Sequence, residues 1–330
     1  MAPLLQSAGH EVTGLDTNLF ANSTFTVAPA DYPTLTVDLR DVQAEHLAGF
    51  DAVIHLAALS NDPLGSLDPA LTYDINHKAS VRLAELAKAA RVRRFLYSSS
   101  CSVYGSAGDE LVTEEAPLAP VTPYGESKVW VEAELVNMAD STFCPVFLRN
   151  ATAYGVSPCL RSDLVLNDFV GAAVTTGTIV VKSDGSALRP LVHIGDISGA
   201  FLAALEAPED AVRGEAFNVG RTDENFTVRE LAELVRAGVP GSDVTFGTGG
   251  KDSRSYRVSF EKIRRHVPGF VPQWTVAAGI EELRAAYEAQ GTTQADLNSR
   301  YVRLHELKRQ QDAGALDATL RPRKLAAASA

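Results

Sequence analysis

The sequence predicts an α/β protein, a doubly wound parallel sheet (Rossmann-like) with a smaller C-terminal lobe. First, short apolar runs alternate with helical patterns through the first half of the chain. Second, the centres of runs such as residues 51–57 and 94–98 are apolar at consecutive positions, which is typical of strands buried on both faces. Third, 330 residues with 45% hydrophobic content can bury a large core as one unit of two lobes.

The elements of the first half follow one another in a regular order. Strands are predicted at residues 11–16, 35–38, 51–57, 94–98 and 145–148. Helices are predicted at residues 70–90 and 123–139, and Pro123 opens the second, as proline often does in a first helical turn. Because strands separated by helices pair in parallel, we expect residues 1–150 to form one sheet covered on both faces.

The second half is less regular. Strands are predicted at residues 178–181 and 216–219, and helices at 196–205, 227–237, 259–265 and 276–289. We expect residues 151–290 to form a mixed lobe, with some elements returning to the sheet. Residues 291–330 are charged and predicted to be a helical packing or oligomer arm that ends in disorder.

Composition excludes several classes of protein. A net charge of −11 and a pI near 5.1 argue against binding to a nucleic acid backbone. Cys101, Cys144 and Cys159 are odd in number and lack metal-ligand spacing, so neither a disulfide framework nor a metal site is expected. The start lacks a signal peptide pattern and no apolar run reaches membrane-spanning length, so we expect a cytoplasmic protein without membrane contact.

Three polar side chains carry the chemistry. Tyr124 and Lys128 are four residues apart and share one helix face, and Ser100 ends a separate strand. A free phenol with a pKa of ~10 is a poor base, but a nearby ammonium favours the phenolate. The serine hydroxyl can bind the same substrate oxygen. Tyr and Lys at this spacing also arise by chance on surface helices, so the strand and Pro123 supply the needed context.

With that context, residues 1 to about 290 resemble the extended short-chain dehydrogenase/reductase family, in its NAD-dependent nucleotide-sugar epimerase/dehydratase branch. The resemblance implies that Tyr124 is the catalytic base and acid. It implies that Lys128 lowers the pKa of Tyr124 and binds the nicotinamide ribose, and that Ser100 positions the sugar hydroxyl. Cys101 and Ser102 stand where the 4,6-dehydratases carry Asp-Glu, which argues against a dehydratase.

A Gly-rich phosphate loop is absent from the sequence. None of the 24 glycines form a G-x-G-x-x-G or G-x-x-G-x-x-G pattern. By resemblance, the chain from residue 3 begins with the second half of the family's first helix, capped by Gly9, and continues into the second strand, so the first strand and loop are missing. Two explanations stay open: Met1 is an internal methionine of a longer product, or the short chain is real and its NAD site is crippled. The missing strand would be central, and its loss would leave two rows of backbone groups unpaired.

Several residues match the family's cofactor site. Asp16 closes a strand where a carboxylate can accept hydrogen bonds from the adenosine ribose and repel a 2′-phosphate, favouring NAD over NADP. The remaining matches are an Asp-hydrophobic pair beside the adenine, a small-residue turn under the cofactor, and a helix asparagine: Asp38, Leu39, Leu56, Ala57, Ala58 and Asn76. A strand-end Asp that only caps a turn is the alternative for Asp16, and His55 is expected to be a core histidine.

The substrate residues are assigned by resemblance. Thr152 replaces an expected asparagine, and Asn167 matches a family asparagine near the diphosphate or base. Arg189 and Arg254 are candidate diphosphate ligands, because a guanidinium fork suits phosphate, although each could be only a surface ion pair. The loop at residues 60–65 selects the sugar or is only a tight turn.

The leading hypothesis is an NAD-dependent nucleotide-sugar epimerase that works through a keto-sugar intermediate, with a homodimer common in the resembled family. A net NAD-dependent reductase or dehydrogenase on an activated sugar is the nearest alternative. A non-catalytic scaffold of the same fold is the second, because the Gly-rich loop is missing.

Overall fold

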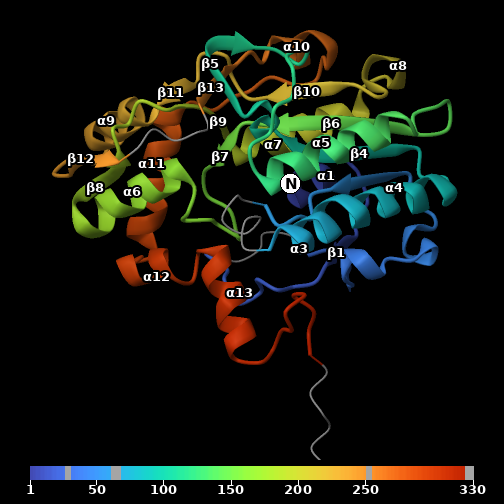
Figure 1. The fold of residues 1–330 in the computed structure, drawn as a ribbon, viewed down its shortest axis with the longest axis horizontal. Coiled ribbons are helices and arrows are strands. Elements are labelled where there is room, and N and C mark those ends of the chain that lie inside the picture. Colours follow the sequence, from blue (N-terminus) through green and yellow to red (C-terminus); the bar gives the residue numbers. More distant parts are fainter. Residues whose placement is uncertain (27–30, 61–67, 250–254, 324–330) are drawn as a thin grey trace, which may run out of the picture.

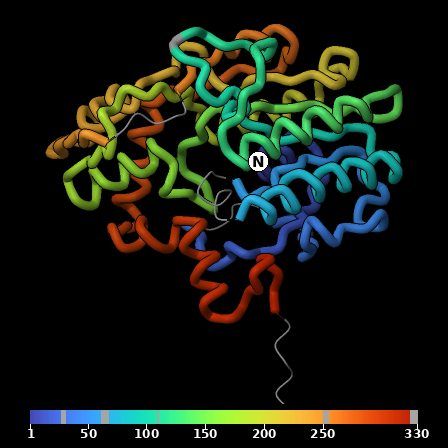
Figure 2. The backbone as a smooth tube through the Cα atoms, in the orientation of Figure 1, coloured from blue at the N-terminus to red at the C-terminus, as the bar shows by residue number. Residues whose placement is uncertain are grey.

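The computed structural model describes residues 1–26, 31–60, 68–249 and 255–323. Its centre is a parallel sheet in the strand order β10-β6-β4-β3 (Figure 1). These strands are β3 (Ala52–His55), β4 (Arg94–Ser100), β6 (Cys144–Asn150) and β10 (Ala216–Val219). The predicted α/β class is confirmed. β10 comes from the second half of the chain and returns to pair with β6, a path that can be followed in Figure 2.

Both faces of the central sheet are covered by helices, as alternation along β4 requires. Phe95 and Tyr97 are buried against α4 and α5, whereas Leu96 is buried in the cluster that contains α7. Near the first face lie α3 (Pro69–Tyr73), a π-helical segment η3 (Asp74–Lys78), α4 (Ala79–Ala89) and α5 (Pro123–Val136). α7 (Ile194–Glu206) covers the other face, and α1 (Ala2–Ser7) packs on α7.

The first two strands stand apart from this sheet. β1 (Gly14–Asp16) and β2 (Thr34–Thr36) form a separate parallel pair. Two short 3-10 helices follow, η1 (Leu39–Asp41) and η2 (Ala44–Leu47). In the described part of the chain, one edge of β1 and one edge of β3 lack a strand partner.

The second lobe consists of small sheets and helices around its own apolar core. Its sheets are β11-β9-β7 and β12-β8, and β13 pairs with β5. The strands are β5 (Ser106–Val112), β7 (Thr152–Tyr154), β8 (Thr178–Ser183), β9 (Leu188–His193), β11 (Asn225–Thr227), β12 (Asp243–Gly249) and β13 (Ser255–Val258). The remaining helices are η4 (Cys101–Tyr104), α6 (Val165–Thr176), α8 (Glu209–Val212), α9 (Val228–Gly238), α10 (Glu261–His266), α11 (Val276–Ala289), α12 (Gln294–Asn298) and α13 (Arg303–Asp312). None of the described helices has the length and apolarity that a bilayer span needs.

Candidate active site

The start of α5 carries Tyr124 and Lys128 to the end of β4. The helix begins at Pro123, and the Thr122 side chain caps it by accepting a hydrogen bond from the Gly125 N–H at 3.2 Å. A Cβ on Gly125 would lie 3.3 Å from the Ser102 carbonyl oxygen. The first turn of α5 therefore packs tightly against the turn that follows Ser100, so the two segments of the candidate site meet.

Lys128 is buried between two tyrosine rings. Lys128 is only 3% exposed, and its Nζ donates a hydrogen bond to the Ser98 carbonyl oxygen at 2.6 Å. The ammonium lies 4.6 Å from the ring centroid of Tyr97 and 5.5 Å from that of Tyr124. Burial lowers the pKa of Lys128 to about 7, against the opposing charge of Glu132. The lysine is thus able to gain or lose charge near neutral pH, next to Tyr124.

Ser100 ends β4 opposite Asn150, which ends β6. The Ser100 hydroxyl oxygen accepts a hydrogen bond from the Ser102 N–H at 3.1 Å, which caps η4 and leaves the O–H as a donor. Asn150 donates to the Ser98 hydroxyl at 3.1 Å, and its Oδ1 is buried without a hydrogen-bond partner among the described residues. Asn150 was not predicted from the sequence, although its place at a strand end beside Ser100 is a usable signal.

A buried ion pair between α5 and β6 lies next to this site. Glu132 and Arg149 are 6% and 5% exposed, and their closest charged atoms are 2.6 Å apart. Glu132 also accepts a hydrogen bond from the Ser99 hydroxyl at 2.5 Å, and Arg149 donates to the Tyr104 hydroxyl at 3.0 Å. The network fixes α5 to β4 and β6, next to the residues of the candidate site. Glu132 was also missed, although it lies one helical turn after Lys128.

Cys101, which follows Ser100, is a packed residue. It is 1% exposed, and its Sγ contacts the Arg149 carbonyl oxygen at 3.1 Å. Burial raises the pKa of its thiol, so the thiolate needed for nucleophilic chemistry is disfavoured.

The predicted cofactor residues lie at the ends of β1 and β3. Asp16 is exposed, and its carboxylate accepts a hydrogen bond from the Asn18 N–H at 2.6 Å. Leu56 is 48% exposed just after β3, Ala57 is exposed, and Ala58 is half-buried. An exposed leucine beside small residues offers an open apolar surface at the sheet end, where dinucleotides bind in this fold class.

Asn76 fixes the turn that holds these small residues. It is buried in η3, and its Oδ1 accepts a hydrogen bond from the Leu59 N–H at 2.7 Å. Its amide donates to the Leu59 carbonyl oxygen at 3.1 Å. The asparagine therefore clamps the backbone just after Ala58, and its direct contact with a cofactor stays a prediction.

Asp38 and Leu39 form a cap rather than an open ligand pair. The Asp38 carboxylate holds the Arg40 guanidinium at 2.9 and 2.6 Å and also accepts the Arg40 N–H at 2.9 Å. Burial would raise the pKa of Asp38, but these hydrogen bonds hold it below its usual value. Leu39 is buried in the core beside α4. Any contact of this pair with an adenine stays a prediction.

Apart from Ser100, the predicted substrate residues that the structure describes lie on elements of the second lobe. Thr152 is half-buried in β7, two residues after Asn150 at the active-site end of β6. Asn167 is buried in α6. Its Oδ1 accepts a hydrogen bond from the Gly155 N–H at 3.1 Å, and its Nδ2 donates one to the Arg161 carbonyl oxygen at 2.9 Å. Arg189 is half-buried on β9 and donates to the Leu188 carbonyl oxygen at 2.8 Å. Arg254 and most of the loop 60–65 lie outside the described residues.

His193 and Asp196 are placed at the start of α7, where they organise backbone. His193 Nδ1 accepts a hydrogen bond from the Gly195 N–H at 3.0 Å, and its ring stacks on Trp274 with centroids 3.7 Å apart. The Asp196 carboxylate accepts hydrogen bonds from the N–H groups of Gln273 and Trp274 at 2.8 and 3.0 Å. These contacts join α7 to the segment that precedes α11.

His55 gives the fold a pH dependence. It is 3% exposed, its Nε2 lies 2.7 Å from the Ser80 hydroxyl, and burial, with the Lys128 charge, lowers its pKa to about 3. In the unfolded chain the same group titrates near ~6.5, so only the unfolded state is protonated between these values. Lowering the pH from 7.5 to 5 should therefore cost about 2 kcal/mol of stability through this residue. Urea unfolding of the wild type and of His55→Gln at both pH values measures this change in the free energy of unfolding.

The His55→Gln variant should lose this part of the pH dependence, whatever its stability at pH 7.5. If the free energy of unfolding fell equally in both proteins between pH 7.5 and 5, His55 would not titrate as its burial requires.

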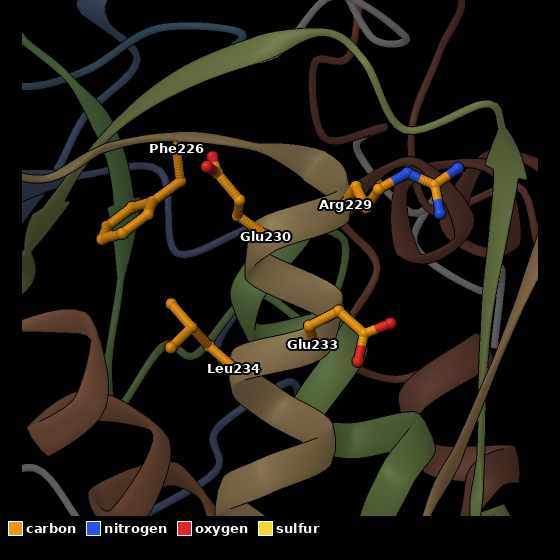
Figure 3. Close-up of a pocket in the computed structure, with 5 residues that line it drawn as sticks. All are labelled: Phe226, Arg229, Glu230, Glu233 and Leu234. Atoms are coloured by element: carbon orange, nitrogen blue, oxygen red, sulfur yellow. The ribbon is translucent and has the colours of Figure 1, made fainter.

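Two surface hollows lie elsewhere. One, of about 500 Å³, is lined by Phe226, Leu234 and charged residues on α9 (Figure 3). The other, of about 420 Å³, is lined by Arg221 and Arg264 with nearby acids. No predicted site residue lines either one. Within the described ranges, no group of three or more His, Cys, Asp or Glu side chains could hold a metal ion.

Comparison with protein families gives one clear match. Residues 1–220 match the model of the NAD dependent epimerase/dehydratase family. The chain is 31% identical over 220 residues to UDP-glucose 4-epimerase 2 of Oryza sativa, covering 60% of this chain and 54% of that protein. It is 27% identical over 275 residues to UDP-glucose 4-epimerase 2 of Arabidopsis thaliana, covering 75% of this chain and 76% of that protein.

Solved structures share the fold. DesIV, a dTDP-glucose 4,6-dehydratase from Streptomyces venezuelae with NAD and TYD bound, superposes with a TM-score of 0.76 at 24% identity, over 89% of this chain and 95% of that one. A UDP-glucose 4-epimerase from Thermotoga maritima with UDP-glucose superposes with a TM-score of 0.73 at 21% identity, over 87% and 94%. At this level of identity the likeness establishes the fold.

Proposed function

Since the chain belongs to the NAD-dependent epimerase/dehydratase family, we propose that it is a nucleotide-sugar epimerase in which Tyr124, Lys128 and Ser100 handle the sugar hydroxyl. The observation that carries the proposal is the position of Lys128, buried 5.5 Å from the Tyr124 ring at the end of β4. A fold alone does not require a buried lysine beside a tyrosine, because burying an ammonium is costly. Chemistry at the phenol explains the arrangement.

The residues present fit NAD at both of its ends. Asp16 offers an exposed carboxylate for ribose hydroxyls, and Leu56 and Ala57 offer an open apolar surface. Lys128 would hold the nicotinamide ribose. The sequence offers no Gly-rich loop for the pyrophosphate. When bound, NAD would accept a hydride from a sugar carbon and return it.

The chain's own residues move the proton. Ser100 donates a hydrogen bond to the reacting sugar oxygen and orients it. Tyr124, ionised beside the Lys128 ammonium, takes the proton from that oxygen and later gives it back. Glu132 and the Tyr97 ring favour the charged lysine, so they keep Tyr124 active near neutral pH.

The substrate class is a nucleotide sugar, in keeping with relatives named UDP-glucose 4-epimerase. Cys101 and Ser102 lack the acid and base that elimination of water needs, which favours epimerisation over dehydration. Arg189 and Arg254 are proposed to bind the diphosphate, with Thr152 and Asn167 beside the substrate.

The test uses UDP-glucose, related UDP- and dTDP-sugars, and a trace of NAD. The epimerase proposal predicts a new epimer by proton NMR without accumulation of NADH. NADH appearing in step with the product would instead identify the second candidate, a net dehydrogenase. If neither a new epimer nor NADH forms with any of these sugars, a scaffold is favoured, for which the structural argument is that one edge of β1 and one edge of β3 lack a strand partner among the described residues.

We also propose that the protein is a homodimer through α5. Trp130 and Val136 on this helix are 41% and 42% exposed, and Trp130 packs on Tyr73 at 4.8 Å and His77 at 5.4 Å between ring centroids. An exposed aromatic cluster of this kind is typical of the centre of an interface.

The variant Trp130→Glu places a charge in this cluster and should convert the dimer to a monomer. Light scattering after gel filtration measures the mass. Val180→Glu, at a valine 58% exposed on β8, is the matched control and should stay dimeric. A wild-type monomer, or a dimer that survives Trp130→Glu, would refute this interface.

A further inference from the structure

The C-terminal segment 303–323, here called the C-terminal strap, packs on the N-terminal part of the chain. Figure 1 shows α13 beside the dark blue chain near β1. Leu307, Leu316 and Leu320 of the strap are buried in one apolar cluster. Packed with them are Leu304 of the strap itself and four residues of the N-terminal part, Leu19, Phe20, Leu59 and Leu71. The strap therefore covers a surface formed by residues that are more than 200 positions away in sequence.

Polar contacts fix the strap at the same surface. Gln310 Nε2 donates to the Leu19 carbonyl oxygen at 2.5 Å, and the Arg303 guanidinium lies 4.0 Å from the ring centroid of Phe20. Arg321 forms a two-bond ion pair with Asp41, one bond being 3.1 Å long. Directed contacts of this kind define one docked position rather than a loose apolar association.

The points of contact are next to every segment assigned to the adenosine half of the cofactor. Leu19 follows Asp16 by three residues, Asp41 ends the turn that begins at Asp38, and Leu59 follows Ala58. The Arg321 charge also helps to lower the pKa of Asp38. The strap thus contacts segments that follow the β1–β2 pair and a segment that follows β3, and the β1–β2 pair is not joined to β3 by strand pairing.

The start of the strap, and the residues that lead into it, are anchored in the second lobe. The Ser162 N–H donates to the Tyr301 carbonyl oxygen at 3.2 Å, and the Ser162 hydroxyl donates to the Leu297 carbonyl oxygen at 2.6 Å. Arg303 donates to the Cys159 carbonyl oxygen at 3.0 Å. The strap is therefore a tie between the two lobes that passes the ends of β1 and β3.

We infer that the C-terminal strap closes the adenosine end of the cofactor site, so that a bound dinucleotide is retained until the strap detaches. The inference rests on the proposed function, since it takes NAD as the ligand. Its structural basis is independent, because the contacts of the strap are with the loops around the site and not with Tyr124, Lys128 or Ser100. A docking surface with few buried side chains and one half-exposed ion pair can open locally without global unfolding.

The test uses charge reversal at the ion pair in the full-length chain. Arg321→Asp and Asp41→Arg each place like charges together and should loosen the strap, whereas the double variant restores the attraction. The readouts are the Kd for NAD by calorimetry and the rate of tryptic cleavage within the strap, with and without NAD. Arg236→Asp reverses a surface ion pair on α9 and is the matched control.

Each single variant should weaken NAD binding about tenfold, within the ~5–150-fold range of ordinary site coupling. NAD should slow cleavage of the strap in the wild type, and the double variant should recover most of the affinity. A strap that is cleaved faster in Arg321→Asp while the Kd is unchanged would overturn this inference alone. A folded wild type that does not bind NAD would overturn the proposed function as well as the inference that rests on it.

Discussion

Replacing Tyr124 by Phe should lower kcat by ~10²–10⁴, the usual contribution of a positioned acid–base group. The change removes one oxygen atom and keeps the ring beside Lys128, which lies 5.5 Å from its centroid. The sugar hydroxyl then has no group to take its proton, whereas binding of the substrate is little changed. KM should therefore stay within a fewfold of the wild-type value.

The measurement is the rate of epimer formation at saturating sugar, for the wild type and Tyr124→Phe. Tyr73→Phe is the matched control, because Tyr73 also bonds to α5, through Glu126, but lies outside the candidate site. Its kcat should be that of the wild type. Full activity in Tyr124→Phe would remove the mechanism, and equal losses in both variants would point to damage of α5.

Replacing Arg149 by Met should destabilise the fold by about 3–5 kcal/mol, since it leaves the Glu132 carboxylate buried without its partner. Glu132 is 6% exposed and cannot be hydrated in place. A loss of this size is a large part of the ~5–15 kcal/mol by which a domain is stable. Urea unfolding at pH 7.5 measures the difference.

The double variant Arg149→Met with Glu132→Leu should recover much of the loss, because an apolar pair carries no desolvation cost. Arg236→Ala, which breaks a surface pair with Glu233, should cost less than ~1 kcal/mol and serves as the control. If Arg149→Met were as mild as Arg236→Ala, the buried network would not be holding α5 to the sheet.

Much of the fold could be predicted because local patterns and long-range packing agree. The centre of the run 94–98 is apolar, and the run forms part of β4 with Phe95 and Tyr97 on one face and Leu96 on the other. Pro123 begins α5 as predicted. The helix predicted at 70–90 is interrupted by the π-helical segment η3, which the sequence pattern does not reveal. Asn76 lies in that segment and bonds to Leu59.

The rest depends on contacts that no local pattern contains. β5, β7, β9, β11, β12 and β13 were not predicted, because these strands are defined by pairing between distant segments. The role of Glu132 depends on Arg149 and Ser99 coming together in three dimensions. The strap could be predicted to be helical, but its docking on Leu19 and Asp41 depends on tertiary contacts alone.

Cofactor binding is tested most simply by calorimetric titration of NAD and NADP into the wild-type chain, with folding checked by circular dichroism. We expect saturable binding of one NAD per chain, and weaker binding of NADP because Asp16 repels a 2′-phosphate. A folded chain that releases no heat with NAD would contradict the redox mechanism and leave a scaffold of the same fold.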